Sequence, residues 1–280
     1  MENYNSVVCN NLKKGFMKDE QFIKIVNSEY FAPLLSVNQH GSSKILEEIP
    51  SGDMFAILSN WLLRPVAPVT NAVRRFKERY LEDNYVIGIE MNVLTDTSDT
   101  GIMPQSQQEL FFKEASDASF RAREDLPDQQ GIVSLVVTDD EAALRERLGS
   151  TEDSLSAKGV IAILPSRGYG TIRILTELQQ AWLLGYADVC IVTAASAIGV
   201  LGHARMSRAP IVIEDSTTAH QSTSSQPCLA DVGKIQHATC FVPSMLSRLS
   251  YDPNVPCLGN PPSTVTSSDE SRARMRRLEL

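Results

Sequence analysis

From residue 85 onward, short apolar segments alternate with segments that have helical periodicity. The apolar segments, rich in valine and isoleucine, are 85–93, 131–138, 160–165, 189–192 and 210–213. The helical patterns between them are 107–123, 141–148 and 171–186. Short strands that are apolar on both faces and joined by helices are typical of a parallel sheet covered on two sides. The sequence therefore predicts an α/β fold with a doubly wound parallel sheet within residues 85–225.

The residues before this alternation show helical patterns without the apolar, strand-like segments. Residues 1–84 include helical patterns at 54–63 and 71–81, and Pro65 and Pro68 lie between the two. Proline removes a backbone donor and disrupts a helix interior, so we expect these two residues to end the first helix. The sequence predicts a separate helical region over 1–84.

The C-terminal region, 226–280, is an irregular tail that carries Cys228, Cys240 and Cys257. Their clustering fits disulfides formed in an oxidising compartment, and it fits three free thiols equally well. Their spacing relative to the histidines matches no usual zinc site. Cys190 lies inside an apolar strand, where we expect a small buried thiol.

The balance of charge and hydropathy argues against two classes of protein. With 34 acidic and 26 basic residues, the chain has a net charge of −8, which does not suit a dedicated nucleic-acid binder. No apolar stretch approaches the roughly 20 residues that span a bilayer, and the first residues lack the pattern of a signal peptide. The sequence alone predicts a soluble protein with no membrane segment and no visible targeting signal.

The segment after the strand at 189–192 is the first candidate for a binding site. Small residues from Thr193 to Ala197 lead into a new helix, in which Gly199 permits a close approach to the backbone. A helix that starts directly after a strand presents free N–H groups and its positive dipole end, which suits a phosphate. Thr193 and Ser196 are placed to hydrogen-bond a diphosphate. The same residues are equally compatible with a tight strand-to-helix corner that binds nothing.

Two acidic residues offer further hypotheses. Asp139 directly follows the strand at 131–138, where a carboxylate can bind a ribose hydroxyl or cap the next helix. Glu177 lies on a helix and is interpreted either as a ligand of a nucleotide sugar ring or as an exposed side chain. The glycine fingerprints of dinucleotide enzymes and of P-loop NTPases are missing, which argues against a nucleotide-binding oxidoreductase. No acidic motif typical of a metal site follows a strand, so no cofactor or metal is predicted.

Four segments, taken in order, carry a family resemblance: 28–35, SEYFAPLL; 55–65, FAILSNWLLRP; 71–73, NAV; and 86–93, VIGIEMNV. They resemble motifs of the plant xyloglucan-type α1,2-fucosyltransferases, glycosyltransferase family 37. The family pattern YF-x-P-x-L is similar to the first segment, 28–35. The pattern LxRYLxxPxNxVW is similar to 55–65, FAILSNWLLRP, and, after a short insertion, to 71–73, NAV. The C-terminal cysteines resemble those in the tail of that family.

The resemblance continues through the strand–helix region and covers roughly residues 28–260. The family motif IGIQIRV is similar to 86–93, VIGIEMNV, and its ATD strand end to 137–139, VTD. A glutamate, a later aspartate and the motif STFG are similar to Glu177, Asp188 and the run Ser196-Ala-Ile-Gly199. Each piece is weak alone, and the resemblance rests on their common order.

This resemblance implies a Rossmann-like sheet that forms the donor half of a two-domain glycosyltransferase of the GT-B type, with 1–84 as a partial acceptor-side or connecting region. It implies inverting transfer of fucose from GDP-fucose to a galactosyl hydroxyl of a glycan, in the Golgi and without a metal. The family's membrane anchor is not in this chain, and no residue is identified as the general base. The donor-binding residues that it implies are Gly88, Asn92, Asp139, Glu177, Asp188, Ser196, Ala197 and Gly199.

The chain departs from the family at two of these positions. Asn92 stands where the motif has an arginine that binds the donor diphosphate, and an amide supplies neither a charge nor a bidentate fork. Ala197-Ile198 replaces the threonine and phenylalanine of STFG. Either another cation, such as Arg64, Arg167 or Arg173, takes over, or the chain is a weakened or inactive member that acts as a binding module.

Overall fold

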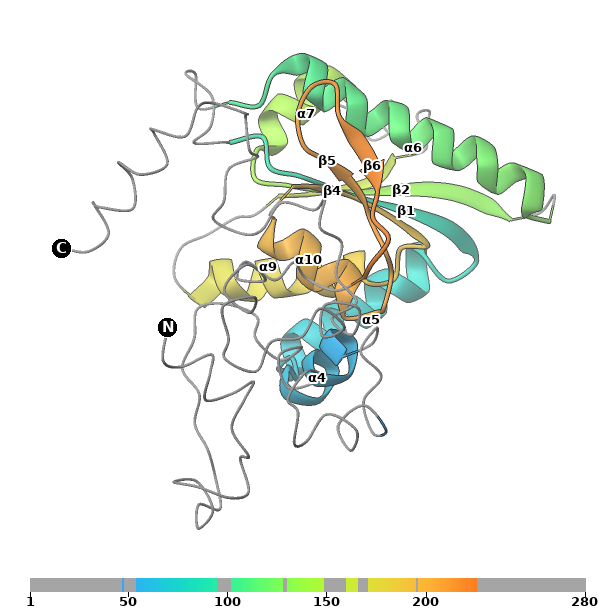
Figure 1. The fold of residues 1–280 in the computed structure, drawn as a ribbon. Helices are drawn as coiled ribbons and strands as arrows, with labels where there is room; N and C mark the ends of the chain where they lie inside the picture. The colour runs from blue at the N-terminus through green and yellow to red at the C-terminus, as the bar shows by residue number, and fades with distance from the viewer. Residues whose placement is uncertain are drawn as a thin grey trace, which may run out of the picture.

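The structure, a computed structural model, describes residues 54–94, 102–127, 130–148, 160–165, 171–194 and 196–225, together with Glu47. Its centre is a six-stranded sheet in the order β3-β2-β1-β4-β5-β6 (Figure 1). The strands are β1 (Asn84–Met91), β2 (Gly131–Thr138), β3 (Val160–Pro165), β4 (Val189–Thr193), β5 (Ile211–Ile213) and β6 (Ala219–Gln221). The first five run parallel, which confirms the predicted doubly wound parallel sheet.

The short strand β6 was not expected, because the residues after 213 look like turn formers. Asp215 builds the turn: its Oδ1 atom accepts hydrogen bonds from the N–H groups of Thr217 and Thr218 at 2.7 and 2.8 Å. The chain then returns antiparallel to β5, with His220 paired to Val212. β6 thereby pairs with the strand that would otherwise form this edge of the sheet.

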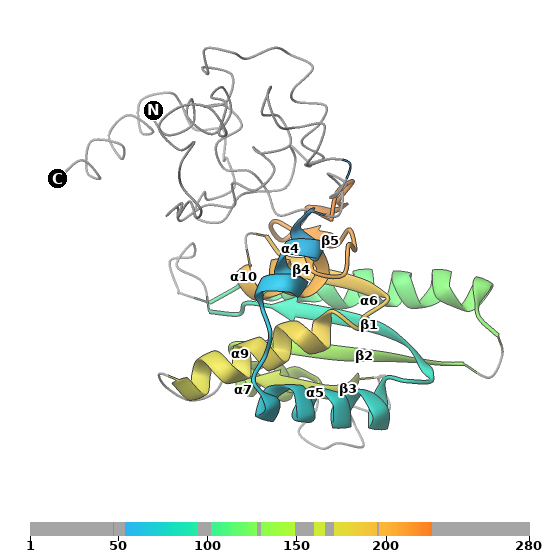
Figure 2. The same ribbon diagram turned by 90° about the horizontal axis from the view of Figure 1, so that it is seen from below.

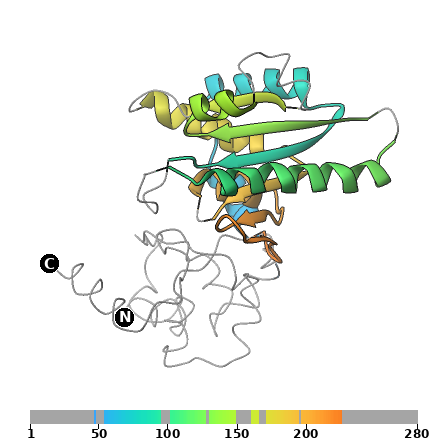
Figure 3. The same cartoon turned by 90° about the horizontal axis from the view of Figure 1, so that it is seen from above.

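Helices cover both faces of the sheet. The helices are α4 (Met54–Leu62), α5 (Ala67–Tyr80), α6 (Gln105–Asp125), α7 (Glu141–Leu148), α9 (Thr171–Leu184) and α10 (Ala197–Ala204). Figure 3 shows α6 running along one face of the sheet. Figure 2 shows α5 and α9 on the opposite face, with α10 and α4 beside them. Their arrangement matches the flanking helices expected for a doubly wound sheet.

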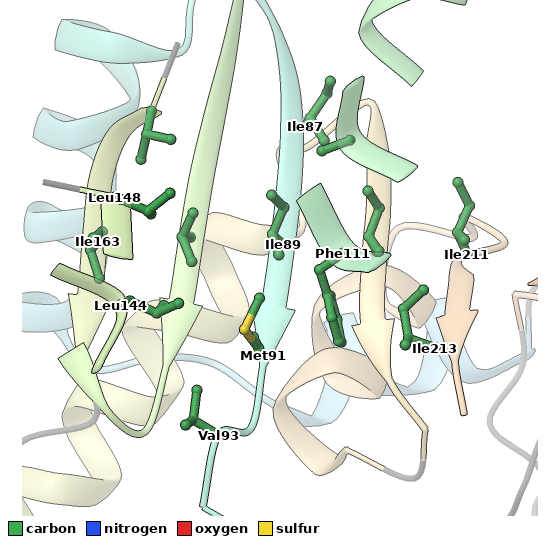
Figure 4. Close-up of a cluster of buried hydrophobic side chains, with 14 of the residues drawn as sticks. Ile87, Ile89, Met91, Val93, Phe111, Leu144, Leu148, Ile163, Ile211 and Ile213 are labelled. Carbon is green, nitrogen blue, oxygen red and sulfur yellow. The ribbon is translucent and has the colours of Figure 1, made fainter. Parts of the chain in front are cut away.

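The face under α6 and α7 holds a continuous apolar cluster. Figure 4 shows Ile87, Ile89 and Met91 along β1, on one side because side chains alternate along a strand. Phe111 of α6 packs against this row and is fully buried, as is Leu144 of α7. Burying a side chain of this size contributes roughly 1.5–3 kcal/mol relative to leaving it exposed.

On the opposite face of β1, Gly88 allows the chain after α9 to approach the sheet closely. A Cβ atom at Gly88 would lie 2.7 Å from the Cβ atom of Ala187 and 3.1 Å from the Cδ2 atom of Leu184. Both neighbours are buried, so neither has room to move aside. Gly88 is therefore a packing residue in the middle of a strand.

Pro68 begins a helix. It lies in the first turn of α5, where its missing N–H would have had no intrahelical partner. α5 consequently starts at Ala67, four residues before the predicted start. Its Val69 and Val73 pack in the same cluster as Val86 of β1, so a helix that precedes residue 85 lies directly on this sheet.

Cys190 is buried and free, as its position in an apolar strand predicted. Burial raises the pKa of its thiol to about 12. The C-terminal tail, 226–280, with its three cysteines, and the motif at 28–35 lie outside the described residues.

The packing at Gly88 makes a direct prediction. We expect Gly88→Ala to lower the free energy of unfolding by roughly 1–3 kcal/mol, because the added methyl group overpacks a filled interior. Gly131→Ala is the matched control: Gly131 is exposed at the start of β2, and its methyl group would meet only the end of the Asn84 side chain. Urea unfolding of both variants measures the difference, and equal losses would show that the close approach at Gly88 is not limiting.

Candidate functional site

The order of the strands places a crevice at the carboxyl ends of β1 and β4. These two strands pair in parallel, Ile87 with Val189 through Glu90 with Val192. The chain leaves β1 towards β2 and leaves β4 towards β5, on opposite sides. The helix that follows β1, α6, covers one face, whereas α10, which follows β4, covers the other. Ligands of open α/β sheets bind at such a switch point.

The N-terminus of α10 lies at this point. Ser196 is the N-cap: its backbone is extended, and its Oγ atom accepts a hydrogen bond from the N–H of Gly199 at 3.1 Å. The N–H groups of Ala197 and Ile198 have no hydrogen-bond partner in the part of the chain that the structure describes. Together with the helix dipole, these two donors can hold an anion.

A buried carboxylate lies beneath this helix end. Glu90, the penultimate residue of β1, is 1% exposed, and its Oε2 atom accepts a hydrogen bond from the N–H of Thr193 at 3.1 Å. The Ser196 hydroxyl also donates to Glu90. A Cβ atom at Gly199 would lie only 3.2 Å from Oε2. Burial raises the pKa of Glu90 to about 7, although these hydrogen bonds act in the opposite direction.

Thr193 connects the ends of β1 and β4. Its Oγ1 atom donates to the Glu90 carbonyl at 3.2 Å and accepts from the Asn92 N–H at 3.0 Å. Its hydroxyl therefore holds the two strand ends in register. The Asn92 side-chain amide, by contrast, makes no hydrogen bond to a described residue and is half-buried at the same edge. Among these residues, Asn92 is the one with a free polar side chain.

Asp139 anchors the segment that follows β1. Its carboxylate accepts hydrogen bonds from the N–H groups of Val93 at 2.6 Å and Leu94 at 3.1 Å. Of the two alternatives for Asp139, a helix cap and a ligand of a ribose hydroxyl, its hydrogen bonds show neither. The carboxylate instead binds the end of the neighbouring strand. Partial burial raises the pKa of Asp139, and the two N–H groups act against that rise.

Glu177 lies apart from these residues. Its Oε1 atom accepts from the Nε atom of Arg173, one helical turn earlier on α9, at 2.7 Å. Arg173 is exposed, and its pKa is raised by the hydrogen bond and charge of Glu177 and, to a smaller extent, by the charge of Asp139. Within the described residues, no hydrogen bond or ion pair joins Glu177 to Ser196 or Asn92.

Two of the expected site residues occupy other places. Gly88 lies in mid-strand under α9. Asp188 precedes β4, and its Oδ2 atom accepts from the N–H of Val86 at 2.8 Å, at the amino end of the sheet. Since Ser196 follows the carboxyl end of β4, Asp188 lies at the opposite edge. The geometry supports a packing role for Gly88 and a strand-pairing role for Asp188.

The structure therefore brings together Asn92, Ser196, Ala197 and Gly199, with Asp139 one strand away. Sequence reasoning missed Glu90, which lies at the centre of this group. A signal was available: a glutamate interrupts an apolar strand predicted to be covered on both faces, and glutamate is rarely fully buried.

The described residues lack two features, a cluster of metal ligands and a helix able to span a membrane. No group of three or more His, Cys, Asp or Glu side chains among the described residues could hold a metal ion. Of the helices that the structure describes, none is both long and apolar enough to cross a membrane.

No protein-family model matches the chain, and no curated protein matches its sequence. Its fold does match solved structures. An arginine-to-lysine mutant of Arabidopsis thaliana FUT1 in complex with GDP aligns with a TM-score of 0.52 and 18% identity, over 72% of this chain and 46% of that chain. The Bradyrhizobium fucosyltransferase NodZ aligns with a TM-score of 0.37 and 14% identity, over 55% and 47%.

The chain thus spans less than half the length of the fucosyltransferases that it matches. At this level of identity, the match to FUT1 shows the fold: a mostly parallel six-stranded sheet flanked by helices, similar to that of a fucosyltransferase.

Two buried groups, Glu90 and His203, make the free energy of unfolding depend on pH, and their effects have opposite signs. Folding raises the pKa of Glu90 from 4.5 to about 7, so the folded protein holds a proton that the unfolded chain releases. Stability therefore falls as pH rises from about 4.5 to 7. Burial lowers the pKa of His203 from 6.5 to about 4, so there the unfolded chain holds the extra proton. That group makes stability rise between about pH 4 and 6.5.

Replacing Glu90 with glutamine should separate the two effects. We expect the advantage of Glu90→Gln over the wild type in free energy of unfolding to grow by roughly 3 kcal/mol between pH 4.5 and 8. Urea unfolding across this range measures it. Glu78→Gln, at an exposed position on α5, is the control. A difference that stays constant with pH would mean that Glu90 does not hold a proton in the folded protein.

Proposed function

We propose that the chain is the donor-binding half of a glycosyltransferase that moves fucose from GDP-fucose to a galactosyl hydroxyl of a glycan, with inversion and without a metal. The observation that carries this proposal is the open N-terminus of α10 at the β1–β4 switch point, in a fold similar to that of FUT1, which was solved with GDP. The family motifs in the sequence point to the same activity.

In this proposal the free N–H groups of Ala197 and Ile198 receive the donor diphosphate. Ser196 and Thr193 fix the helix end, because their hydroxyls are already engaged by Gly199, Asn92 and Glu90. They therefore position the amide donors for the ligand. Such pre-placed donors stabilise developing charge without reorganisation during the reaction.

The proposed reaction develops negative charge on the diphosphate at the carboxyl ends of β1 and β4. The acceptor hydroxyl attacks C1 of fucose, the bond from C1 to the diphosphate oxygen breaks, and GDP leaves with one more negative charge. The acceptor proton passes to a general base, which we assign to no residue of this chain. Stabilising the leaving diphosphate is thus the part of the chemistry that the described residues would serve.

Two of the three arginines named as possible substitutes, Arg64 and Arg173, lie within the described residues, and both are exposed. Arg173 is paired with Glu177. Asn92 contributes an amide where the family motif has arginine, and Arg167 lies outside the described residues. One observation therefore favours a second candidate function, an inactive module that binds a nucleotide: the position at the end of β1 lacks a positive charge.

Nucleotide binding tests the proposal directly. We expect isothermal titration calorimetry to detect GDP binding, with guanosine binding at least tenfold more weakly, because the diphosphate contacts supply much of the affinity. Ser196→Ala should bind GDP more weakly than the wild type does, because losing the N-cap loosens the first turn of α10. Equal affinity for guanosine and GDP would contradict a diphosphate site at this helix.

The missing charge at position 92 makes a prediction about turnover. We expect Asn92→Arg to raise the rate of GDP release from GDP-fucose in the presence of acceptor by roughly ten- to a thousandfold. A guanidinium there stabilises the leaving diphosphate more in the transition state than in the bound donor. Asn92→Gln is the matched control, since it lengthens the side chain without adding charge.

Equal rates for the wild type and Asn92→Arg would mean that another cation already serves the diphosphate. Donor binding without turnover in either protein would favour the inactive binding module.

A further inference from the structure

Glu90 and a bound diphosphate would share one source of positive potential. The carboxylate lies against the inside of the first turn of α10, bonded to the Thr193 N–H and the Ser196 hydroxyl, with Gly199 directly above it. The free N–H groups of Ala197 and Ile198 belong to the same turn. An anion outside the turn and an ionised, buried carboxylate inside it would therefore repel each other.

We propose that Glu90 is a positioning residue that takes up a proton when a nucleoside diphosphate binds at α10, so that donor affinity depends on the protonation of this one buried acid. The inference rests on the proposed function, because it requires the diphosphate to bind at this helix. It adds to the proposed function that donor binding depends on pH through Glu90, a group that does not touch the ligand.

The direction of the effect follows from the charge. While Glu90 is neutral, the positive end of α10 is available to the ligand, as it would be with the glutamine of the family motif. Once Glu90 ionises, its charge offsets the helix dipole and repels the diphosphate. The pKa of Glu90 in the free protein, about 7, places this change near neutrality. Affinity should be constant well below that pH and should fall above it, and binding should be accompanied by the uptake of part of a proton by Glu90.

The expected size comes from Coulomb's law. Two unit charges roughly 8 Å apart, at an effective dielectric constant of ~20, change a binding constant on the order of tenfold to a hundredfold. We therefore expect GDP affinity to fall by about that factor between pH 6.5 and pH 9.

The described elements packed around Glu90 carry other titratable groups. Asp139, at the end of β2, raises the pKa of Glu90 through its charge. On α10, His203 is buried and bonded to the Arg208 carbonyl, and on β4 the thiol of Cys190 donates to the Leu184 carbonyl. The charged pair on α9, Arg173 and Glu177, is partly exposed.

The experiment is GDP titration by calorimetry at several pH values, in pairs of buffers with different ionisation enthalpies, which gives the number of protons taken up. GDP binds protons itself, so the quantity of interest is the wild type minus Glu90→Gln. We expect this difference to reach roughly 0.5–0.8 of a proton between about pH 7.5 and 8, and Glu90→Gln to lose the extra decline in affinity. Glu78→Gln, exposed on α5, should behave like the wild type.

A second measurement does not require the variant to fold. Infrared difference spectra of the wild type at pH 8, with GDP minus without, should show a new band from a protonated buried carboxyl group. Equal proton uptake in the wild type and Glu90→Gln, or no such band, would overturn the role of Glu90 and leave the proposed function standing. Loss of the uptake only in Asp139→Asn would also overturn it. GDP that fails to bind at any pH would instead overturn the proposed function, and this inference with it.

Discussion

The pairing of β1 with β4 is the constraint on which the rest of the molecule depends. The two strands are adjacent in the sheet and about a hundred residues apart in the chain, and Thr193 locks their carboxyl ends through hydrogen bonds to the Glu90 carbonyl and the Asn92 N–H. Because the chain leaves the two strands in opposite directions, this pair creates a switch point, where the N-terminus of α10 lies beside the end of β1. Gly88 permits the end of α9 and the residues after it to pack closely against β1.

Sequence reasoning reached the fold because strand periodicity is a local signal. Valine- and isoleucine-rich segments at regular intervals identify buried strands whatever their order, and all five parallel strands were predicted. The strand β6 was missed because an Asp215 turn, rather than apolar residues, creates it. The first helix ends before the two prolines, as predicted, but α5 starts four residues earlier than predicted, because Pro68 can occupy the first turn of a helix.

The candidate site was harder to predict, because it depends on which residues meet across the sheet. Ser196 and Gly199 were identifiable from a strand that turns into a helix. The sequence places Asp139 directly after a strand, but its partners, the N–H groups of Val93 and Leu94, belong to another strand end and follow from the pairing of β1 with β2. Glu90 needed the three-dimensional structure: only there does a glutamate in an apolar strand prove to lie beneath a helix N-terminus.

The central claim is that a nucleoside diphosphate binds at the N-terminus of α10, at the β1–β4 switch point. A crystal structure of the protein with GDP tests this claim most directly. The account predicts the β-phosphate within hydrogen-bond distance of the N–H groups of Ala197 and Ile198, with the Asn92 side chain turned towards it. A diphosphate bound at another edge of the sheet, or one held by side chains while these two N–H groups stay free, would contradict it.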